Sequence, residues 1–182
     1  PIAAQLILAL QQVVSRRNKP GQPMVLSLGK VIANGATNII PDEVRVEGTM
    51  RTFDEAWRAE LHELLPVLSR GLCEGLGATV DLRIVKGSPV VKNDPELTAR
   101  IRAAAVAFVG ADNVVDMDIR MGAEDFAYYT QVMPGCFFRL GTGNPTKPGT
   151  TSGLHRAEMD IDEDALVIGA GMMAWGALSE LE

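Results

Sequence analysis

The chain has 182 residues, of which 47% are hydrophobic and 22% charged, a balance that excludes a disordered or fibrous protein and fits a globular one. Its formal net charge of -6, without a basic stripe, argues against nucleic acid as a partner. The longest apolar runs are shorter than the roughly 20 residues that span a bilayer, so we expect no membrane segment.

The two cysteines, Cys73 and Cys136, are far apart and lack metal-ligand spacing, which argues against a disulfide framework. A reducing compartment is expected, and with it a cytoplasmic location. The chain opens with Pro1, and Ile2 and Leu6 already keep helical spacing. We therefore expect the sequence to begin inside a fold, so that any targeting signal would lie upstream of it.

The beginning of the chain predicts a helix followed by two strands. A helix is expected over residues 1–17, because the turn-forming residues 18–21 end its apolar periodicity. Residues 24–33 are rich in Val, Ile and Leu and predict a strand. After a loop, residues 44–52 alternate between apolar and charged or polar side chains, which predicts a half-buried strand.

A second helix is expected over residues 54–74, where one face stays apolar. The segment from Thr52 to Glu55 has the spacing of a capping box at its start. Pro66 lies inside this helix and is expected to kink or split it. Alternation over residues 79–84 then predicts a third strand.

The order helix, strand, strand, helix, strand is that of the ferredoxin-like βαββαβ unit without its first strand. We therefore expect residues 1–90 to form an α+β domain of this kind. In residues 91–182 predicted helices and strands alternate along the chain, which indicates a parallel α/β arrangement. The elements expected there are a helix over 95–110 after Asp94, a strand over 114–115, a helix over 124–131, a strand over 136–140, a loop over 141–153 and a last helix from Asp162 or Asp164 to about 181.

The second half is too small to form a parallel sheet by itself. Two short strands and three helices cannot cover both faces of such a sheet, and parallel sheets occur almost only with both faces covered. The last helix is apolar nearly all round, which is typical of a buried helix. We therefore expect residues 91–182 to be the C-terminal part of a larger α/β domain.

His155 and Glu124 are the candidates for chemistry in the second half. His155 lies in a loop between a predicted strand and the last helix, where α/β proteins bind their ligands. It is either a metal ligand or a surface histidine. Glu124 and Asp125 start a predicted helix, whose dipole favours acids. Alternatively, Glu124 faces the same pocket as His155 and orients a ligand there.

Asn38 and Arg51 are the candidates in the first half. Asn38 lies on the predicted loop and Arg51 on the charged face of the strand that follows it. An amide and a guanidinium fork are suited to holding a substrate carboxylate. A turn-forming Asn and a solvated Arg beside Glu47 would explain the same residues without any site.

Together these features resemble one family, the zinc-type amidohydrolases that include hippurate hydrolase, N-acyl-L-amino acid amidohydrolase and plant auxin-conjugate hydrolases. The resemblance covers essentially the whole chain. It is carried, in the expected order, by residues 1–4 with 11–16, residues 35–42 with 48–53, and residues 122–126, 134–135, 140–143 and 154–155. Each string is short, but their order together with the predicted elements is specific.

The resemblance implies metal-dependent hydrolysis of the amide bond of N-acyl amino acids such as hippurate. It implies a ferredoxin-like lid, residues 1–90, inserted into a metal-binding α/β domain that ends with residues 91–182, and homodimers that form through the lids. The implied ion is divalent, with zinc favoured and manganese or another ion open. By the family pattern His155 is the last metal ligand, Asn38, Arg51 and Gly122 contact substrate, and Glu124 is a supporting catalytic group.

We expect His155, Asn38 and Arg51 to converge on one cleft in the intact protein. Two departures from the family pattern are notable, because Arg156 follows His155 where a small residue is more usual, and the other metal ligands and the catalytic Glu are absent from the chain. Catalytic zinc needs about three protein ligands. We therefore expect these 182 residues alone to bind catalytic metal poorly and to be inactive.

Three other functions stay open at this point. A metallo-carboxypeptidase or a desuccinylase on a similar scaffold would act on a peptide or an N-succinyl substrate. A ferredoxin-like module for dimerisation or small-molecule sensing would have no catalytic activity, since that fold hosts many functions.

Overall fold

The computed structural model describes residues 1–181, which divide into two compact units. The first unit comprises residues 1–90 together with residues 120–124, and the second comprises residues 91–119 and the chain from residue 125 onward. Within residues 1–181, none of the helices combines the length and apolar character needed to cross a bilayer.

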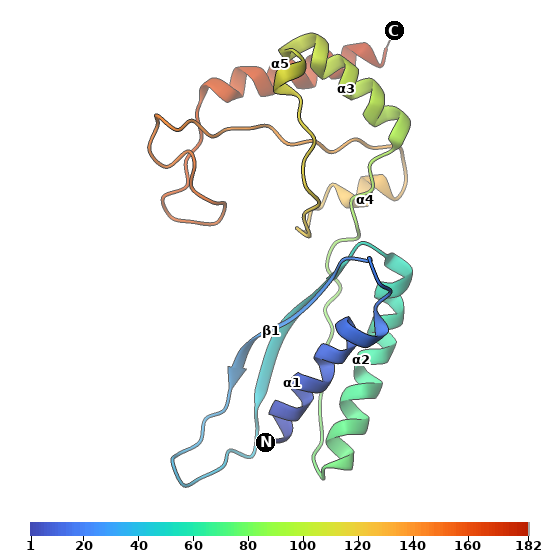
Figure 1. Ribbon diagram of the computed structural model, residues 1–182, viewed down its shortest axis with the longest axis vertical. Coiled ribbons are helices and arrows are strands. Elements are labelled where there is room, and N and C mark those ends of the chain that lie inside the picture. The colour runs from blue at the N-terminus through green and yellow to red at the C-terminus, as the bar shows by residue number, and fades with distance from the viewer. Residues whose placement is uncertain (182) are drawn as a thin grey trace. The chain divides into compact units, whose positions relative to one another are not determined.

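The first unit contains two helices beside an antiparallel β-hairpin (Figure 1). Its elements are α1 (Ile2–Gln12), the π-helical turn η1 (Val13–Arg17), β1 (Met24–Ile32), β2 (Arg45–Thr52) and α2 (Glu55–Gly75). The sequence predicted each of these helices and strands to within two residues at most boundaries. The mixed α/β class is confirmed, and so is the expected order of helix, strand, strand and helix.

The hairpin pairs Met24 with Thr52 at one end and Ile32 with Arg45 at the other. Residues 33–44 connect the strands beyond that second end. Gly48 lets the two backbones approach closely, because a Cβ at this position would lie 2.2 Å from the Ser27 carbonyl oxygen. The hairpin therefore has a fixed register, with the loop at one end and the C-terminus of β2 at the other.

A single apolar core fills the space between the helices and the sheet. Leu61 of α2 is 0% exposed and Val13 of η1 is 1% exposed. Leu10 and Leu65 complete the buried cluster, so each helix contributes residues at helical spacing. The partly buried side chains around it are Leu6, Met24, Leu26, Leu28, Met50, Trp57, Leu64, Leu68 and Ile84.

The start of α2 differs slightly from the predicted capping box. The N-cap residue is Asp54, whose Oδ1 accepts a hydrogen bond of 2.9 Å from the Trp57 N–H. The Thr52 hydroxyl instead accepts from the Asp54 N–H at 3.2 Å. A carboxylate satisfies a free N–H at the helix start and also interacts favourably with the helix dipole.

Pro66 does not split this helix, because α2 runs unbroken from Glu55 to Gly75, whereas the kink stays a prediction. The proline removes one backbone donor. The helix is held together by its buried face, which includes Leu61 and Leu65 before the proline and Cys73 after it. Cys73 is a free thiol, as is Cys136.

The predicted third strand over residues 79–84 does not form, since this segment carries no strand. In a ferredoxin-like sheet, the two strands that flank a helix in the sequence are not neighbours in the sheet, because another strand lies between them. Within residues 1–181 the first unit offers no such strand beside β2, so the segment has no partner for its backbone hydrogen bonds. Ile84 nevertheless packs against the core.

The second unit is built from helices and long irregular segments. Its elements are α3 (Pro95–Val109), the 3₁₀ turn η2 (Ala111–Asn113), α4 (Ala127–Thr130) and α5 (Asp164–Ser179). The predicted cap of α3 is confirmed, because Asp94 Oδ1 accepts a hydrogen bond of 2.8 Å from the Leu97 N–H. The helix expected over residues 124–131 is reduced to the single turn of α4.

The strands predicted over residues 114–115 and 136–140 are also wrong, since neither segment is a strand. A strand needs a neighbour for its backbone groups. Beside Phe137 that neighbour is replaced by a side chain: Asn93 donates to the Phe137 carbonyl at 2.9 Å and accepts from the Phe137 N–H at 2.8 Å. The segment is therefore tied in place without a sheet.

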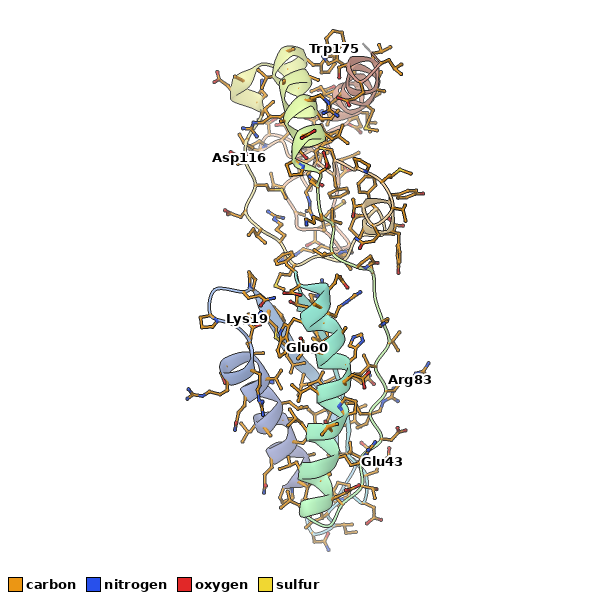
Figure 2. All side chains as sticks on the ribbon, turned by 90° about the vertical axis from the view of Figure 1, so that its right-hand side faces the viewer. Lys19, Glu43, Glu60, Arg83, Asp116 and Trp175 are labelled. Atoms are coloured by element: carbon orange, nitrogen blue, oxygen red, sulfur yellow. The ribbon has the colours of Figure 1, made fainter. Side chains whose placement is uncertain are left out.

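α5 packs against α3 and leaves much of its apolar surface exposed. A Cβ at Gly171 would lie 2.4 Å from the Phe108 ring, so a glycine permits this close contact. Arg100 of α3 also binds Glu180 through two guanidinium nitrogens. The exposed large apolar side chains of α5 are Leu166, Val167, Ile168, Met173, Leu178 and Trp175, the last of which is labelled in Figure 2.

Candidate functional site

Arg51 contacts a distant segment of the sequence within the first unit. It lies near the C-terminus of β2, paired with Val25 of β1. Its Nη1 donates a hydrogen bond of 2.5 Å to the carbonyl oxygen of Met121, 70 positions further along the chain. The structure therefore brings Arg51 next to the segment that carries Gly122 and Glu124.

The guanidinium of Arg51 is exposed and carries no ion pair among residues 1–181. The alternative of a solvated arginine agrees with this exposure, while Glu47 Oε1 lies 3.2 Å from Lys30 Nζ and 2.9 Å from Arg45 Nε. A guanidinium has five N–H donors in a fixed fork. With one nitrogen held by the Met121 carbonyl, the rest of the fork is suited to an anionic group.

Gly122 and Glu124 do not belong to a helix. Gly122 is exposed and Glu124 is half-buried, and α4 begins only at Ala127. The expectation that Glu124 starts a helix is therefore wrong. The favourable field of a helix start falls off within one turn, and α4 itself is only four residues long. The helix dipole consequently does not account for an acid at position 124.

Asn38 lies at the tip of the hairpin loop, as the sequence predicted. Ala36 and Ile39 exchange two backbone hydrogen bonds of 3.1 Å each, which leaves Thr37 and Asn38 in the centre of a tight turn. A Cβ at Gly35 would lie 2.5 Å from the Ile39 carbonyl oxygen, so this turn requires glycine there. The side chain of Asn38 is exposed.

The hairpin separates Asn38 from Arg51. Arg45 is the first residue of β2 on the loop side, and Arg51 lies 51 − 45 = 6 residues further along. At about 3.3 Å per residue, the strand alone places the two ends roughly 20 Å apart. Asn38 therefore lies beyond one end of the hairpin and Arg51 near the other, and their convergence with His155 on one cleft of the intact protein stays a prediction.

His155 belongs to the second unit and has an unusual backbone conformation. Its φ is 68°, and among residues 1–181 it is the one non-glycine residue with positive φ. Side chains with a Cβ rarely adopt this conformation, and such strain is often found at functional sites. The imidazole is exposed. The sequence identified His155 by residue type and position, whereas its backbone strain became visible only in the structure.

Residues 1–181 offer one candidate metal ligand and not a complete centre. Within residues 1–181 no group of three or more His, Cys, Asp or Glu side chains is arranged to hold an ion. Zinc sites usually have three or four protein ligands. An exposed imidazole on a loop fits one of these positions, so His155 is suited to complete a metal centre whose other ligands come from elsewhere.

Asp162 belongs to a polar network that has no signature in the sequence. The sequence predicts Asp162 or Asp164 as a helix cap, and Asp162 does accept a hydrogen bond of 3.2 Å from the Asp164 N–H. It also binds Lys147 and the Asn144 amide. The Lys147 hydrogen bond, followed by that of Asn144, lowers the pKa of Asp162 below its ordinary value. No spacing rule links these three residues, so periodicity could not have found them.

His62, the second histidine of the chain, has a structural environment. It lies half-buried on α2. Burial lowers the pKa of His62, and the positive charges of Lys86 and Arg58 lower it further. The charges of Glu63 and Glu55 act in the opposite direction, so His62 lies among charges of both signs.

Comparison with known sequences identifies several relatives. The protein YhaA of Bacillus subtilis (strain 168) is 35% identical over 178 residues, covering 98% of this chain and 45% of YhaA. The N-acetylcysteine deacetylase of the same organism is 33% identical, with 100% of this chain and 46% of the deacetylase covered. Thermostable carboxypeptidase 2 of Saccharolobus solfataricus is 31% identical, with 93% and 42% covered.

Among solved structures, the chain resembles the Bacillus subtilis YXEP protein, a dinuclear metal-binding peptidase from the M20 family. The TM-score is 0.72 at 27% identity, covering 98% of this chain and 45% of that one. The chain thus spans less than half the length of the relatives it matches. The sequence pattern of peptidase family M20/M25/M40 matches residues 8–175. The chain therefore belongs to peptidase family M20/M25/M40.

Proposed function

We propose that this chain forms the lid and the C-terminal part of the catalytic domain of a metal-dependent hydrolase that cleaves the amide bond of N-acyl amino acids. The observation that carries the proposal is the family match over residues 8–175. A relative named N-acetylcysteine deacetylase supports the substrate class, because its name describes an N-acyl amino acid. The exposed apolar side chains of α5 support a larger domain, since patches of this kind mark contact surfaces.

In the proposed site Arg51 binds the carboxylate of the amino acid. Met121 holds one nitrogen of the guanidinium, which leaves the rest of the fork for a bidentate contact. Gly122 adjoins Met121 and brings main chain without a side chain close to the substrate. Glu124 orients groups around the reacting amide, while the general base is a Glu outside this chain.

His155 supplies one ligand to a divalent metal, with zinc the proposed ion. When bound, the metal lowers the pKa of a water molecule and polarises the amide carbonyl. Removal of the ion with a chelator is expected to abolish hydrolysis of benzoylglycine by the complete enzyme, and a divalent salt should restore it. Metal analysis of the purified enzyme identifies the ion.

We further propose a homodimer that forms through the first unit, with Asn38 reaching the site of the other copy. Because the hairpin separates Asn38 from Arg51, both contact one substrate only when they come from two copies. Mixing inactive Asn38→Ala and Arg51→Ala variants should restore activity in mixed dimers, which have one intact site. Mixed dimers that stay inactive would contradict this arrangement and leave the hydrolase proposal standing.

Substitution of Arg51 tests the substrate-binding role directly. Arg51→Lys keeps the positive charge but loses the guanidinium fork. KM for benzoylglycine should therefore rise more than tenfold, which corresponds to the loss of about one charged hydrogen bond. The change in kcat should be smaller. Arg45→Lys is the matched control on the same strand, since Arg45 pairs with Glu47. Equal effects of the two substitutions would contradict the role of Arg51.

The isolated chain tests whether residues 1–182 need the rest of the protein for metal binding and hydrolysis. With one candidate ligand, residues 1–182 should bind catalytic metal weakly and hydrolyse no benzoylglycine. Turnover at a rate near that of the complete enzyme would contradict this proposal.

A carboxypeptidase is the second candidate, favoured by the relative named thermostable carboxypeptidase 2. The fork of Arg51 would hold the terminal carboxylate of a peptide equally well. Comparing kcat/KM for benzoylglycine with values for an N-blocked dipeptide and for an N-succinyl amino acid separates acylase, carboxypeptidase and desuccinylase. A non-catalytic sensing module would hydrolyse none of them.

A further inference from the structure

His155 lies in the middle of a loop whose two ends are hydrogen-bonded together. Residues 151–159 form this loop, which we call the His155 loop. At its base the Asp160 N–H donates to the Gly149 carbonyl at 3.3 Å. The Asp162 N–H donates to the Thr142 carbonyl at 2.9 Å. Main-chain hydrogen bonds therefore join the two segments on either side of the loop.

Two nearly buried polar side chains reinforce this base. Asp162 is 9% exposed and Thr150 is 7% exposed. Asp162 accepts a hydrogen bond of 2.7 Å from the Asn144 amide and another from Lys147 Nζ. The Thr150 hydroxyl accepts from the Asn144 N–H at 2.9 Å and lies 2.7 Å from the Asn144 carbonyl. Buried polar groups with satisfied partners rigidify a structure.

The tip of the loop has no comparable anchoring by packing. Every residue from 153 to 160 is exposed. A further constraint comes from Gly149, which has φ +81° and where a Cβ would lie 2.7 Å from the Glu158 carbonyl oxygen. The buried contacts of the loop therefore lie at its base, while its exposed tip carries the positive φ of His155.

We propose that Lys147 and Asp162 are positioning residues for His155. By closing the base of the His155 loop they hold its backbone in the conformation that presents the imidazole to a metal ion. The inference rests on the proposed function, in which His155 is a metal ligand. Groups that hydrogen-bond to a metal ligand typically change metal affinity 10- to 100-fold when they are removed, and groups further from the ligand should have effects at the lower end of this range.

The test uses Lys147→Met in the complete enzyme, because the Lys147 side chain is 41% exposed and its replacement leaves the buried groups in place. Zn²⁺ affinity is measured by competition with a chelating dye, and amide hydrogen exchange is measured over residues 151–159. We expect about tenfold weaker Zn²⁺ binding and faster exchange in the His155 loop. Lys147→Arg should retain most of the Zn²⁺ affinity and most of the protection from exchange, since it keeps the positive charge.

Lys30→Met is the matched control, because it removes an exposed lysine that pairs with Glu47 in the first unit. It should change neither readout. If Lys147→Met does not fold, Thr150→Val removes the hydroxyl from the same base and should give the same two changes. Exchange and Zn²⁺ affinity equal to those of the unaltered enzyme would overturn the proposal, and so would faster exchange without a loss of affinity.

His155→Ala separates this inference from the proposed function. If His155→Ala weakens Zn²⁺ binding and Lys147→Met does not, the positioning role is wrong and the ligand role stands. If His155→Ala leaves the affinity unchanged, His155 is not a ligand, and the inference falls with that assignment.

Discussion

The two units of the chain are stabilised in different ways. In the first, large side chains such as Leu61 and Val13 are buried, and both helices and both strands pack around them. In the second, the buried apolar residues are mostly small: Ala104, Ala127, Ala165 and Met172. Ion pairs and hydrogen bonds, such as those of Arg100 with Glu180 and of Lys147 with Asp162, hold much of the second unit in place.

This difference indicates which unit depends on its surroundings. Burial of apolar surface contributes roughly 25 cal/mol per Å², so a unit with large buried side chains supplies its own stability. The second unit instead exposes large apolar side chains on α5. Its local geometry is maintained by caps, glycines and polar networks, and its overall stability should depend on a surface that covers α5.

The largest effect is expected from a cavity in the first unit. Leu61→Ala should destabilise this unit by about 2–5 kcal/mol, because Leu61 is 0% exposed. Urea unfolding followed by Trp57 fluorescence, in a Trp175→Phe background, reports this unit. Leu8→Ala is the control, since Leu8 on α1 is 69% exposed and should change little. Equal losses would mean that the first unit has no core of its own.

In the second unit the sharpest effect is expected at a glycine. Gly149→Ala should cost about 1–3 kcal/mol, because it combines positive φ with a Cβ that overlaps the Glu158 carbonyl. Gly110→Ala is the control, with φ +86° and no atom within 4 Å of the new Cβ. Urea unfolding followed by Trp175 fluorescence in a Trp57→Phe background measures both. A larger loss at Gly110 would contradict the steric argument.

Helix capping should have an intermediate effect. Asp94→Ala removes the acceptor for the Leu97 N–H and should destabilise the second unit by about 1 kcal/mol. Asp94→Ser keeps a side-chain oxygen at the cap and should recover most of the loss. The same Trp175 fluorescence assay measures both variants. If serine were no better than alanine, the cap would not be what stabilises α3.

The smallest effect is expected from pH. The Lys147 hydrogen bond lowers the pKa of Asp162, so the stability that this carboxylate contributes is lost as pH falls through its folded-state pKa. The Asp162 hydrogen bond raises the pKa of Lys147, so the contribution of Lys147 is lost as pH rises through its folded-state pKa. Between these limits the pair contributes fully, although solvent screening at Lys147 keeps the effect small.

The measurement is the difference in thermal midpoint between the unaltered protein and Lys147→Met across the pH range. The difference should be largest near neutral pH and shrink in both acid and alkali. A difference that stays constant from acid to alkali would show that Lys147 and Asp162 do not stabilise the second unit as an ion pair.

Local features of this protein were predictable from the sequence by itself. Apolar periodicity located α1, α2, α3 and α5, alternation located the hairpin, and residue types located the cap at Asp94. The order of short motifs indicated the family that the comparisons show. Each of these signals depends on neighbours within about one or two helical turns, where backbone preference and side-chain spacing decide the outcome.

Other features were decided only by the tertiary structure. Whether residues 79–84 form a strand depends on a partner strand, and the continuity of α2 through Pro66 depends on packing along its buried face. The contact of Arg51 with Met121 joins groups 70 positions apart. The hairpin register, which carries Asn38 away from Arg51, is set by pairing between two strands. Such contacts depend on how distant segments come together, which no local pattern in the sequence specifies.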